Sequence, residues 1–284
     1  MSELGTVDPS IAAMPRGGPT ASWLDRRLQT DELEFTDRYD IPDEIKQSVV
    51  SALDRMGSRF GLHEKNARAA LSVVADIANP RILELGAGHG KLSAKLVELH
   101  PSATVTVSDL DPTSVANIAA SDLGAQPRVR TQVIDATAIE ADDKSYDLVV
   151  FAASFHHLPP ATAMRAIAEG TRVGDRFLVI DLKRQSLLGL VFTQLIVAPI
   201  AKVAVKVRAP FGGILHDGYI SALRAYSRSA FIALGEAADP QMRIQFPPTS
   251  TTRFGPNGAT YLFTRSNTTL ISRNHLKPKD SRRS

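Results

Sequence analysis

The sequence contains no cysteine, and this absence removes several kinds of chemistry at once. Disulfide bonds, thiolate nucleophiles, cysteine-ligated zinc and iron–sulfur clusters all need a sulfur that the chain lacks. The excess of one charge sign over the other is also small: the formal net charge is +3. The positive excess lies mainly in the last residues, NHLKPKDSRRS. A basic tail does not make a basic face, so the composition does not favour nucleic acid as a partner.

The N-terminus also does not have the pattern expected of a signal peptide, because it lacks a basic stretch followed by an apolar segment. We therefore expect a cytoplasmic protein. With 284 residues and 43% hydrophobic content, the chain can bury a large core, and one domain with an insertion is expected rather than two equal domains. Residues 1–20 are rich in Gly, Pro, Ser and Ala without apolar periodicity, which predicts a flexible arm.

Helical periodicity dominates residues 21–76, which predicts an N-terminal helical cap. From Arg81 onward, strand-like and helix-like segments alternate, beginning with RILEL and continuing through ATVTVSDLD, RVRTQVID, YDLVVFAAS and RFLVIDLK. This alternation implies a mostly parallel sheet with helices on both faces. We expect QMRIQF and ATYLFTR to close the sheet as a hairpin. The core is then residues 77–265, and a basic tail follows at 266–284.

An apolar insertion interrupts this alternation at about residues 184–226. Its segment SLLGLVFTQLIVAPIAKVAVKV is close to the roughly 20 residues that span a bilayer, but it contains Gln194, Pro199, Lys202 and Lys206. We expect a helical cover over the active site or a dimer contact. A membrane span and an interfacial membrane contact are less favoured alternatives and stay open.

Three glycines stand at every second position where the first strand meets its helix: Gly86, Gly88 and Gly90. A dinucleotide-binding turn needs G-x-G-x-x-G, and here Lys91 occupies the position of the third glycine. Glu84 stands two residues before the first glycine. With it, ELGAGHG resembles the first motif of the class I S-adenosylmethionine-dependent methyltransferases, in which the backbone lies against the amino acid part of the cofactor.

Three further segments follow in the order of that family, so the resemblance covers about residues 77–182. It implies that Asp109, after the second strand, accepts hydrogen bonds from both ribose hydroxyls, and that Asp135 and Ala136 hold the adenine. NAD-binding proteins also place an acid at the ribose position, so Asp109 alone does not discriminate between the two cofactors. The expected cofactor contacts are Glu84, Gly86, Ala87, Gly88, Gly90, Asp109, Leu110, Asp135, Ala136 and Phe151.

The fold implied by the resemblance is an α/β, Rossmann-like seven-strand methyltransferase sheet with an N-terminal helical cap and an inserted helical cover. The cofactor is S-adenosylmethionine and its product is S-adenosylhomocysteine. No metal is expected, because no acidic cluster like that of catechol methyltransferases follows the fourth strand. That strand also lacks the N/D-P-P-Y/F signature, since it continues as Phe151-Ala-Ala-Ser-Phe. Nucleobase and glutamine amide acceptors are therefore not favoured.

The segments LHDGYISALRAYS and DELEFTDRYDIPDEIKQSVVSALDRMGSRFGLHEKNAR resemble bacterial methyltransferases that act on indole C3 of tryptophan-derived diketopiperazines and form pyrroloindolines. Such a transfer makes the ring nitrogen acidic, so a base must accept a proton. His216 and Tyr219 are the first catalytic candidates, with Glu34, Asp37 and Tyr39 as partners or substitutes. The expected substrate-binding residues are Trp23, Glu34, Phe35, Tyr39, His157 and Tyr226.

A purely structural role stays open as the alternative for several of these residues. His216 could be a local turn partner of Asp217, Trp23 a core anchor, and Tyr226 a packing residue. Methylation of oxygen or nitrogen in another specialised metabolite or a quinone is the nearest alternative activity. A scaffold that binds S-adenosylmethionine without turnover is the alternative outside enzymes. A homodimer is expected as the assembly.

Overall fold

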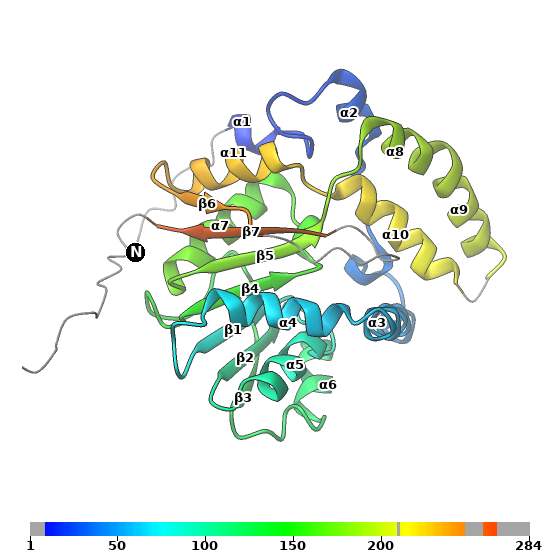
Figure 1. Ribbon diagram of the computed structural model, residues 1–284. Coiled ribbons are helices and arrows are strands. Elements are labelled where there is room, and N and C mark those ends of the chain that lie inside the picture. Colours follow the sequence, from blue (N-terminus) through cyan, green and yellow to red (C-terminus); the bar gives the residue numbers. More distant parts are fainter. Residues whose placement is uncertain (1–8, 209–210, 248–257, 266–284) are drawn as a thin grey trace, which may run out of the picture.

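A seven-stranded sheet organises the computed structural model, which describes residues 9–208, 211–247 and 258–265 (Figure 1). Its order is β3-β2-β1-β4-β5-β7-β6. The strands are β1 Arg81–Leu85, β2 Thr104–Asp109, β3 Val129–Val133, β4 Leu148–Ala152, β5 Phe177–Leu182, β6 Arg243–Gln245 and β7 Gly258–Thr264. Strands β1 to β5 are parallel, whereas β7 is antiparallel to β5 and β6. The predicted α/β sheet and its closing hairpin are confirmed.

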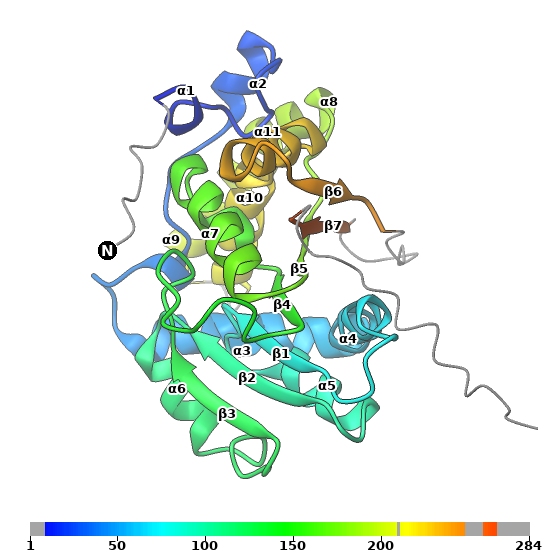
Figure 2. The same cartoon turned by 90° about the vertical axis from the view of Figure 1, so that its left-hand side faces the viewer.

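Helices cover both faces of the sheet (Figure 2). One hydrophobic cluster joins the sheet to α4 Leu62–Val73, α5 Lys91–Leu99 and α6 Pro112–Ala119. The other joins it to α7 Pro160–Val173 and α11 Arg228–Ala238. The central strand β4 and residues 177–180 of β5 are continuous apolar runs because side chains on both faces of these strands are buried.

The expected flexible arm differs from the structure over residues 9–20. Helix α1, Pro9–Ala12, lies against the α7–α11 layer, and Met14 is part of that hydrophobic cluster. The buried guanidinium of Arg16 donates to the His156 carbonyl at 2.8 Å and lies 4.4 Å from the centre of the Tyr226 ring. One apolar anchor and one buried cation therefore fix a segment that is too short to show periodicity. Residues 1–8 and the predicted basic tail at 266–284 lie outside the described residues.

The N-terminal cap consists of separate pieces with different positions. Helix α2, Trp23–Leu28, is close to the insertion, and the 3-10 turn η1, Phe35–Asp37, leads to α3, Asp43–Arg59. Helix α3 begins after Pro42 with two acidic residues in its first turn, which suits a helix N-terminus. Gly61, at φ +63°, makes the turn into α4, which packs on α5 as part of the sheet's helical layer.

The insertion folds as helices, as predicted. A continuous helical rod is made of α8 Leu187–Phe192, a π-helical turn Thr193–Val197 and α9 Ala198–Lys206, and α10 Gly212–Arg224 lies beside it. The wide turn comes just before Pro199, which has no N–H to continue the regular hydrogen-bond ladder. The inner face of the rod packs through Leu190, Ala198 and Ala201 against Ile220 and Leu223.

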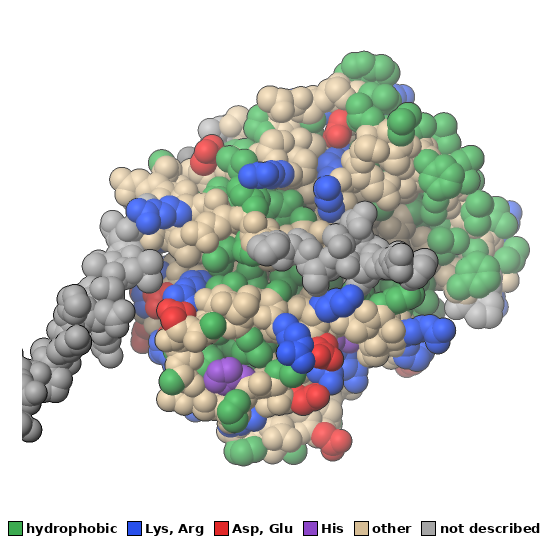
Figure 3. Space-filling model, in the orientation of Figure 1, with side chains coloured by type: hydrophobic (Ala, Val, Ile, Leu, Met, Phe, Trp, Pro, Cys, Tyr) green, Lys and Arg blue, Asp and Glu red, His purple; other side chains and the backbone are tan. Residues whose placement is uncertain are grey.

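The outer face of this rod is apolar and open to solvent. Hydrophobic side chains gather there in Figure 3; the large exposed ones are Leu187, Leu188, Phe192, Leu195, Ile196, Ile200, Val203 and Val207. Within the described part of the chain, Leu187–Lys206 is the helix that is long and apolar enough to cross a membrane by length and composition, with a mean hydropathy of 2.0.

Candidate active site

The glycine loop lies at the carboxyl end of β1. Gly86, Gly88 and Gly90 have φ values of +62°, +57° and +70°, a region that favours glycine over any residue with a Cβ. A Cβ on Gly86 would lie 2.6 Å from Ser154 Oγ, whereas one on Gly88 would meet only Val50, at 3.5 Å. The loop therefore needs glycine for its conformation, and it leaves room beside Gly88 where a ligand can approach the backbone.

Asp109 ties the end of β2 to this loop. Its Oδ2 accepts a hydrogen bond from Gly88 N at 2.8 Å, and its Oδ1 accepts one from Asp111 N at 2.9 Å. Burial raises the pKa of the Asp109 carboxyl. Each carboxylate oxygen can accept more than one hydrogen bond. The carboxylate can therefore hold the loop and still accept from a pair of ribose hydroxyls, so it fits the predicted cofactor.

Glu84 lies behind the loop. Its Oε2 accepts hydrogen bonds from Ser93 N at 3.0 Å and from the Ser93 hydroxyl. The Glu84 carboxyl therefore caps a backbone N–H in the first turn of α5. Burial raises the pKa of this carboxyl to about 8. Both hydrogen bonds bind Glu84 to α5, so the structure places this residue as a support of the glycine loop.

The remaining predicted cofactor residues surround the same edge of the sheet. Asp135 follows β3 and is exposed, and its Oδ1 accepts from Thr137 N at 2.8 Å. Leu110 is 56% exposed, which leaves an apolar surface available beside Asp109. Ala87 N donates to the Ser108 carbonyl at 2.9 Å. Phe151 is buried beneath Gly86, where its ring would lie 2.8 Å from an added Cβ.

Helix α3 covers the glycine loop through contacts that the sequence analysis missed. His89 Nε2 lies 2.8 Å from Gln47 Oε1, and His89 Nδ1 lies 2.8 Å from Asp54 Oδ2. The buried Lys46 is 3.7 Å from Asp111. The only available signal was a histidine inside the glycine motif, which named no partner. Helix α3 therefore belongs to the cofactor side of the molecule.

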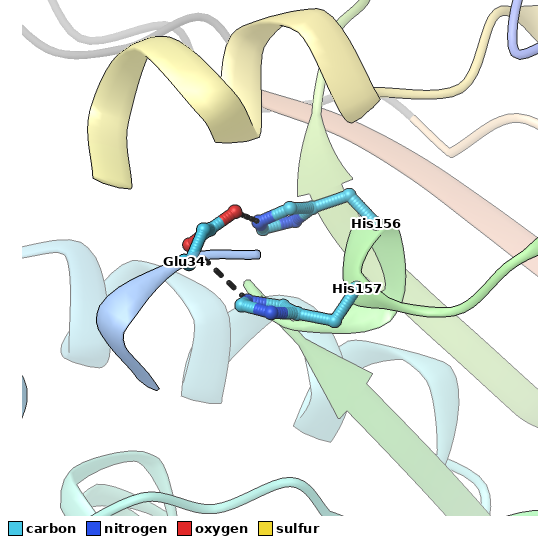
Figure 4. Close-up of side chains that lie close together, drawn as sticks. All are labelled: Glu34, His156 and His157. Carbon is cyan, nitrogen blue, oxygen red and sulfur yellow. Dashed lines mark ion pairs between the residues drawn. The ribbon is translucent and has the colours of Figure 1, made fainter. Parts of the chain in front are cut away.

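Glu34, His156 and His157 converge beside the carboxyl end of β4 (Figure 4). The two histidines belong to the 3-10 turn η2, Phe155–His157, and Glu34 immediately precedes η1. His156 Nε2 is 3.4 Å from Glu34 Oε1, and His157 Nε2 is 3.6 Å from Glu34 Oε2. Ser221 on α10 donates to Glu34 at 2.9 Å. Glu34 is therefore a buried group held by α10 and η2, and it is not an open substrate contact.

Two further carboxylates hold the outer edges of the histidines. His156 Nδ1 lies 2.8 Å from Asp181 on β5, and His157 Nδ1 lies 2.6 Å from Asp37 on η1. Burial opposes charge on His156, but Asp181 and Glu34 raise its pKa to about 10. Burial also disfavours the Asp37 carboxylate, whereas His157 and Arg224 lower its pKa to about 2. The cluster is therefore highly charged.

The two predicted catalytic residues, His216 and Tyr219, lie on α10 beside Glu32. His216 Nδ1 is 2.9 Å from Asp217, its Nε2 is 3.6 Å from Glu32, and its ring centre is 4.6 Å from that of Phe35. The Tyr219 hydroxyl donates to Glu32 at 3.0 Å. Burial and Glu32 raise the pKa of the Tyr219 phenol, so it stays protonated at neutral pH. The structure thus brings His216, Tyr219 and Phe35 together.

Three predicted aromatic walls lie elsewhere. Trp23 is 74% exposed on α2, and Tyr39 is 75% exposed with Lys46 Nζ 4.5 Å from its ring centre. Tyr226 is 1% exposed, and its hydroxyl donates to the Leu158 carbonyl at 2.8 Å. The expectation that Tyr226 binds substrate is corrected, because this residue packs in the core against Phe155 and Phe231. Aromatic character alone does not distinguish a substrate wall from core packing.

A separate cleft of about 780 Å³ lies next to β5 and β7. Its walls include Asp25, Lys183, Arg184, Arg228, Phe246 and Tyr261. None of the glycine-loop residues lines it, so this cleft is distinct from the cofactor edge.

Comparison with known proteins identifies the central part of the chain. Residues 82–174 match the family model described as a methyltransferase domain. A malonyl-[acyl-carrier protein] O-methyltransferase of Geobacter sulfurreducens is 39% identical over 93 residues, which cover 33% of this chain and 34% of that protein. An uncharacterised methyltransferase of Mycobacterium tuberculosis is 32% identical over 139 residues, or 48% and 55% of the two chains. The chain thus spans about a third to about half the length of these relatives.

Solved structures extend the similarity to most of the fold. The plantazolicin methyltransferase BpumL, in complex with S-adenosylhomocysteine, has a TM-score of 0.56 at 12% identity, covering 85% of this chain and 97% of its own. The methyltransferase domain of bacterial CtHen1-CN has a TM-score of 0.51, also at 12% identity, with 72% and 99% covered. Residues 82–174 are therefore a methyltransferase domain within a Rossmann-like methyltransferase fold.

Proposed function

We propose that the whole chain transfers the methyl group of S-adenosylmethionine to a small aromatic acceptor. The observation that carries this proposal is the glycine loop, with three left-handed glycines linked to Asp109 inside the matched domain. When bound, the cofactor supplies an electrophilic methyl group on a sulfonium. Positioning donor and acceptor in line accounts for much of the acceleration of such a transfer. The loop and Asp109 would hold the donor.

The acceptor we favour is indole C3 of a tryptophan-derived diketopiperazine. Its support is the resemblance of the α10 and N-terminal segments, together with the proton-accepting groups that the two segments place side by side. His216 is the better base of the two predicted catalytic residues, because the Tyr219 hydroxyl stays protonated and donates a hydrogen bond to Glu32. Phe35, tilted by 47° against the His216 ring, offers an aromatic surface for a flat substrate.

Methylation of an oxygen atom is the second candidate activity. Two relatives are named O-methyltransferases: the Geobacter protein, and a ubiquinone biosynthesis O-methyltransferase of Xanthomonas euvesicatoria that is 32% identical over 117 residues. The open apolar face of α8 and α9 would suit a quinone-like acceptor. A binding scaffold without turnover is disfavoured by the complete glycine loop. The cytoplasmic location, the homodimer and the lack of a nucleic acid partner remain predictions.

A substrate panel tests the acceptor. Purified protein is incubated with S-adenosylmethionine and tryptophan diketopiperazines, simple indoles, phenols or quinones, and products are identified by mass spectrometry and NMR. A methyl group on a quaternary carbon of a closed pyrroloindoline supports the favoured acceptor. A methyl group on oxygen or nitrogen refutes it and supports the second candidate. Tight cofactor binding without any transfer supports the scaffold.

An Asp109→Ala variant tests the cofactor assignment by calorimetric titration with S-adenosylhomocysteine. Hydrogen bonds to charged groups contribute about 1.5–3 kcal/mol, so we expect binding about 10–100-fold weaker. Asp111→Ala is the matched control, because Asp111 Oδ1 caps α6 by accepting from Thr113 N at 3.1 Å. Unchanged binding by Asp109→Ala would remove this carboxylate from the ribose site.

A further inference from the structure

The spacing within the Glu34–His156–His157 cluster points to a shared ligand. Direct hydrogen bonds between charged nitrogen and oxygen groups are about 2.7–2.9 Å long. The two histidine Nε2 atoms instead lie 3.4 Å and 3.6 Å from the Glu34 oxygens, and the three ligand atoms are all within 4.8 Å of one another. Two ligands of one tetrahedral zinc ion, with bonds of about 2.0–2.1 Å, are separated by about 3.4 Å. The two histidine–glutamate distances are therefore those of neighbouring ligands around one cation.

The outer contacts of both histidines have the arrangement that metal ligands need. A carboxylate at Nδ1 keeps the proton there, so that a metal binding at Nε2 displaces only the Nε2 proton and uses the lone pair of that atom. Asp181 plays this part for His156 at 2.8 Å, and Asp37 plays it for His157 at 2.6 Å. Both Nε2 atoms then face the same carboxylate, as Figure 4 shows. One imidazole with a carboxylate partner is common, but two that face a third ligand specify a site.

An unpartnered buried atom is the second observation. His156 is 3% exposed, and its Nε2 atom has no hydrogen-bond partner among the described residues. Buried polar atoms in native proteins are nearly always paired. A cation between His156 and Glu34 would satisfy this atom.

We propose that Glu34, His156 and His157 bind one divalent transition-metal ion, with Zn²⁺ as the first candidate. Two imidazoles and a carboxylate are suitable zinc ligands, and three protein ligands leave one tetrahedral position open for water or an acceptor oxygen. His157, whose side chain is 20% exposed, is the ligand nearest to solvent. This site does not depend on the identity of the methyl acceptor. It differs from the sequence-based expectation of no metal, because the third ligand is more than 120 residues away in the chain.

Metal titration of the full chain, prepared without a histidine tag and stripped with EDTA, tests the proposal. We expect one equivalent of Zn²⁺ in calorimetry, and the visible spectrum of tetrahedral Co²⁺ when Co²⁺ is added instead. Asp37→Asn leaves the three ligands in place but changes the outer contact of His157 and the ion pair with Arg224. It should weaken Zn²⁺ binding about 10–100-fold. His157→Gln should weaken it further and remove the Co²⁺ spectrum.

His216→Gln is the matched control. Its imidazole also has a carboxylate at Nδ1, from Asp217, and a second carboxylate 3.6 Å from Nε2, but it has no second imidazole. This variant should bind Zn²⁺ like the wild type. Circular dichroism and S-adenosylhomocysteine binding verify that each variant is folded. Absence of the one-equivalent site, or equal binding by His157→Gln and the wild type, would overturn the proposal and leave the cluster as imidazolium–carboxylate ion pairs.

Discussion

The cofactor edge and the acceptor side of this protein are built in different ways. The cofactor edge is a short loop and two strand ends, held by backbone conformation and by hydrogen bonds such as Gly88 N to Asp109. The acceptor side is assembled from η1, η2 and α10, whose side chains meet across 120 to 187 residues of sequence. A site made of local backbone geometry leaves a readable motif, whereas a site made of distant charge pairs does not.

Breaking one pair on the acceptor side should give the largest effect. Arg224 is buried and donates to Asp37 Oδ2 at 2.6 Å and to the His157 carbonyl. Arg224→Met keeps much of the packing but leaves Asp37 without its guanidinium partner. We expect the free energy of unfolding, measured by urea titration, to fall by about 3–5 kcal/mol. The double variant with Asp37→Asn should recover part of this loss. A loss under about 1 kcal/mol would mean that the pair behaves like an exposed one.

Two alanine variants sharpen the comparison on the cofactor edge. Gly86→Ala and Gly88→Ala both place a Cβ in the left-handed region, at a cost of about 1–3 kcal/mol each. Only Gly86→Ala also collides with Ser154 and Phe151. The unfolding temperature should therefore fall more in Gly86→Ala than in Gly88→Ala. Gly88→Ala should mainly lose affinity for S-adenosylhomocysteine. Equal unfolding temperatures would contradict the packing described under the loop.

The buried carboxyl of Glu84 should give the cofactor edge a dependence on pH. Its pKa is raised to about 8, so the folded protein holds this proton more tightly than the unfolded chain. The resulting stabilisation is complete below about pH 4.5 and is lost as the pH rises through 8. Glu84→Gln should remove this part of the decline between pH 5 and 8, measured by thermal unfolding in parallel with the wild type. Identical pH profiles would show that Glu84 ionises without cost.

The smallest effect concerns Tyr226, which the sequence places at the substrate and the structure places in the core. Tyr226→Phe loses one hydrogen bond to the Leu158 carbonyl, which should cost about 1 kcal/mol of stability. The KM for the acceptor should stay as in the wild type. A clear rise in KM without a change in kcat would return Tyr226 to the substrate site.

The same contrast explains what the sequence could predict. Alternating apolar segments were enough for the sheet and its closing hairpin, and the spacing of Gly86, Gly88 and Gly90 located the loop. The role of Glu84 as a helix cap was missed because an acid before a glycine loop has the same appearance in either role. His156, Asp181 and Arg224 were missed as a group because each is an ordinary residue until the fold brings its partner close.

Arg16 connects the N-terminal segment to the acceptor side of the protein. Its guanidinium holds the carbonyl of His156, one of the converging histidines, and stacks on Tyr226. Shortening the chain to about residue 21, which its composition invites, would withdraw Met14 from the core and this cation from η2. A shortened protein would keep its glycine loop, His156 and Tyr226. It would lose the Arg16 contacts that hold these two residues in place.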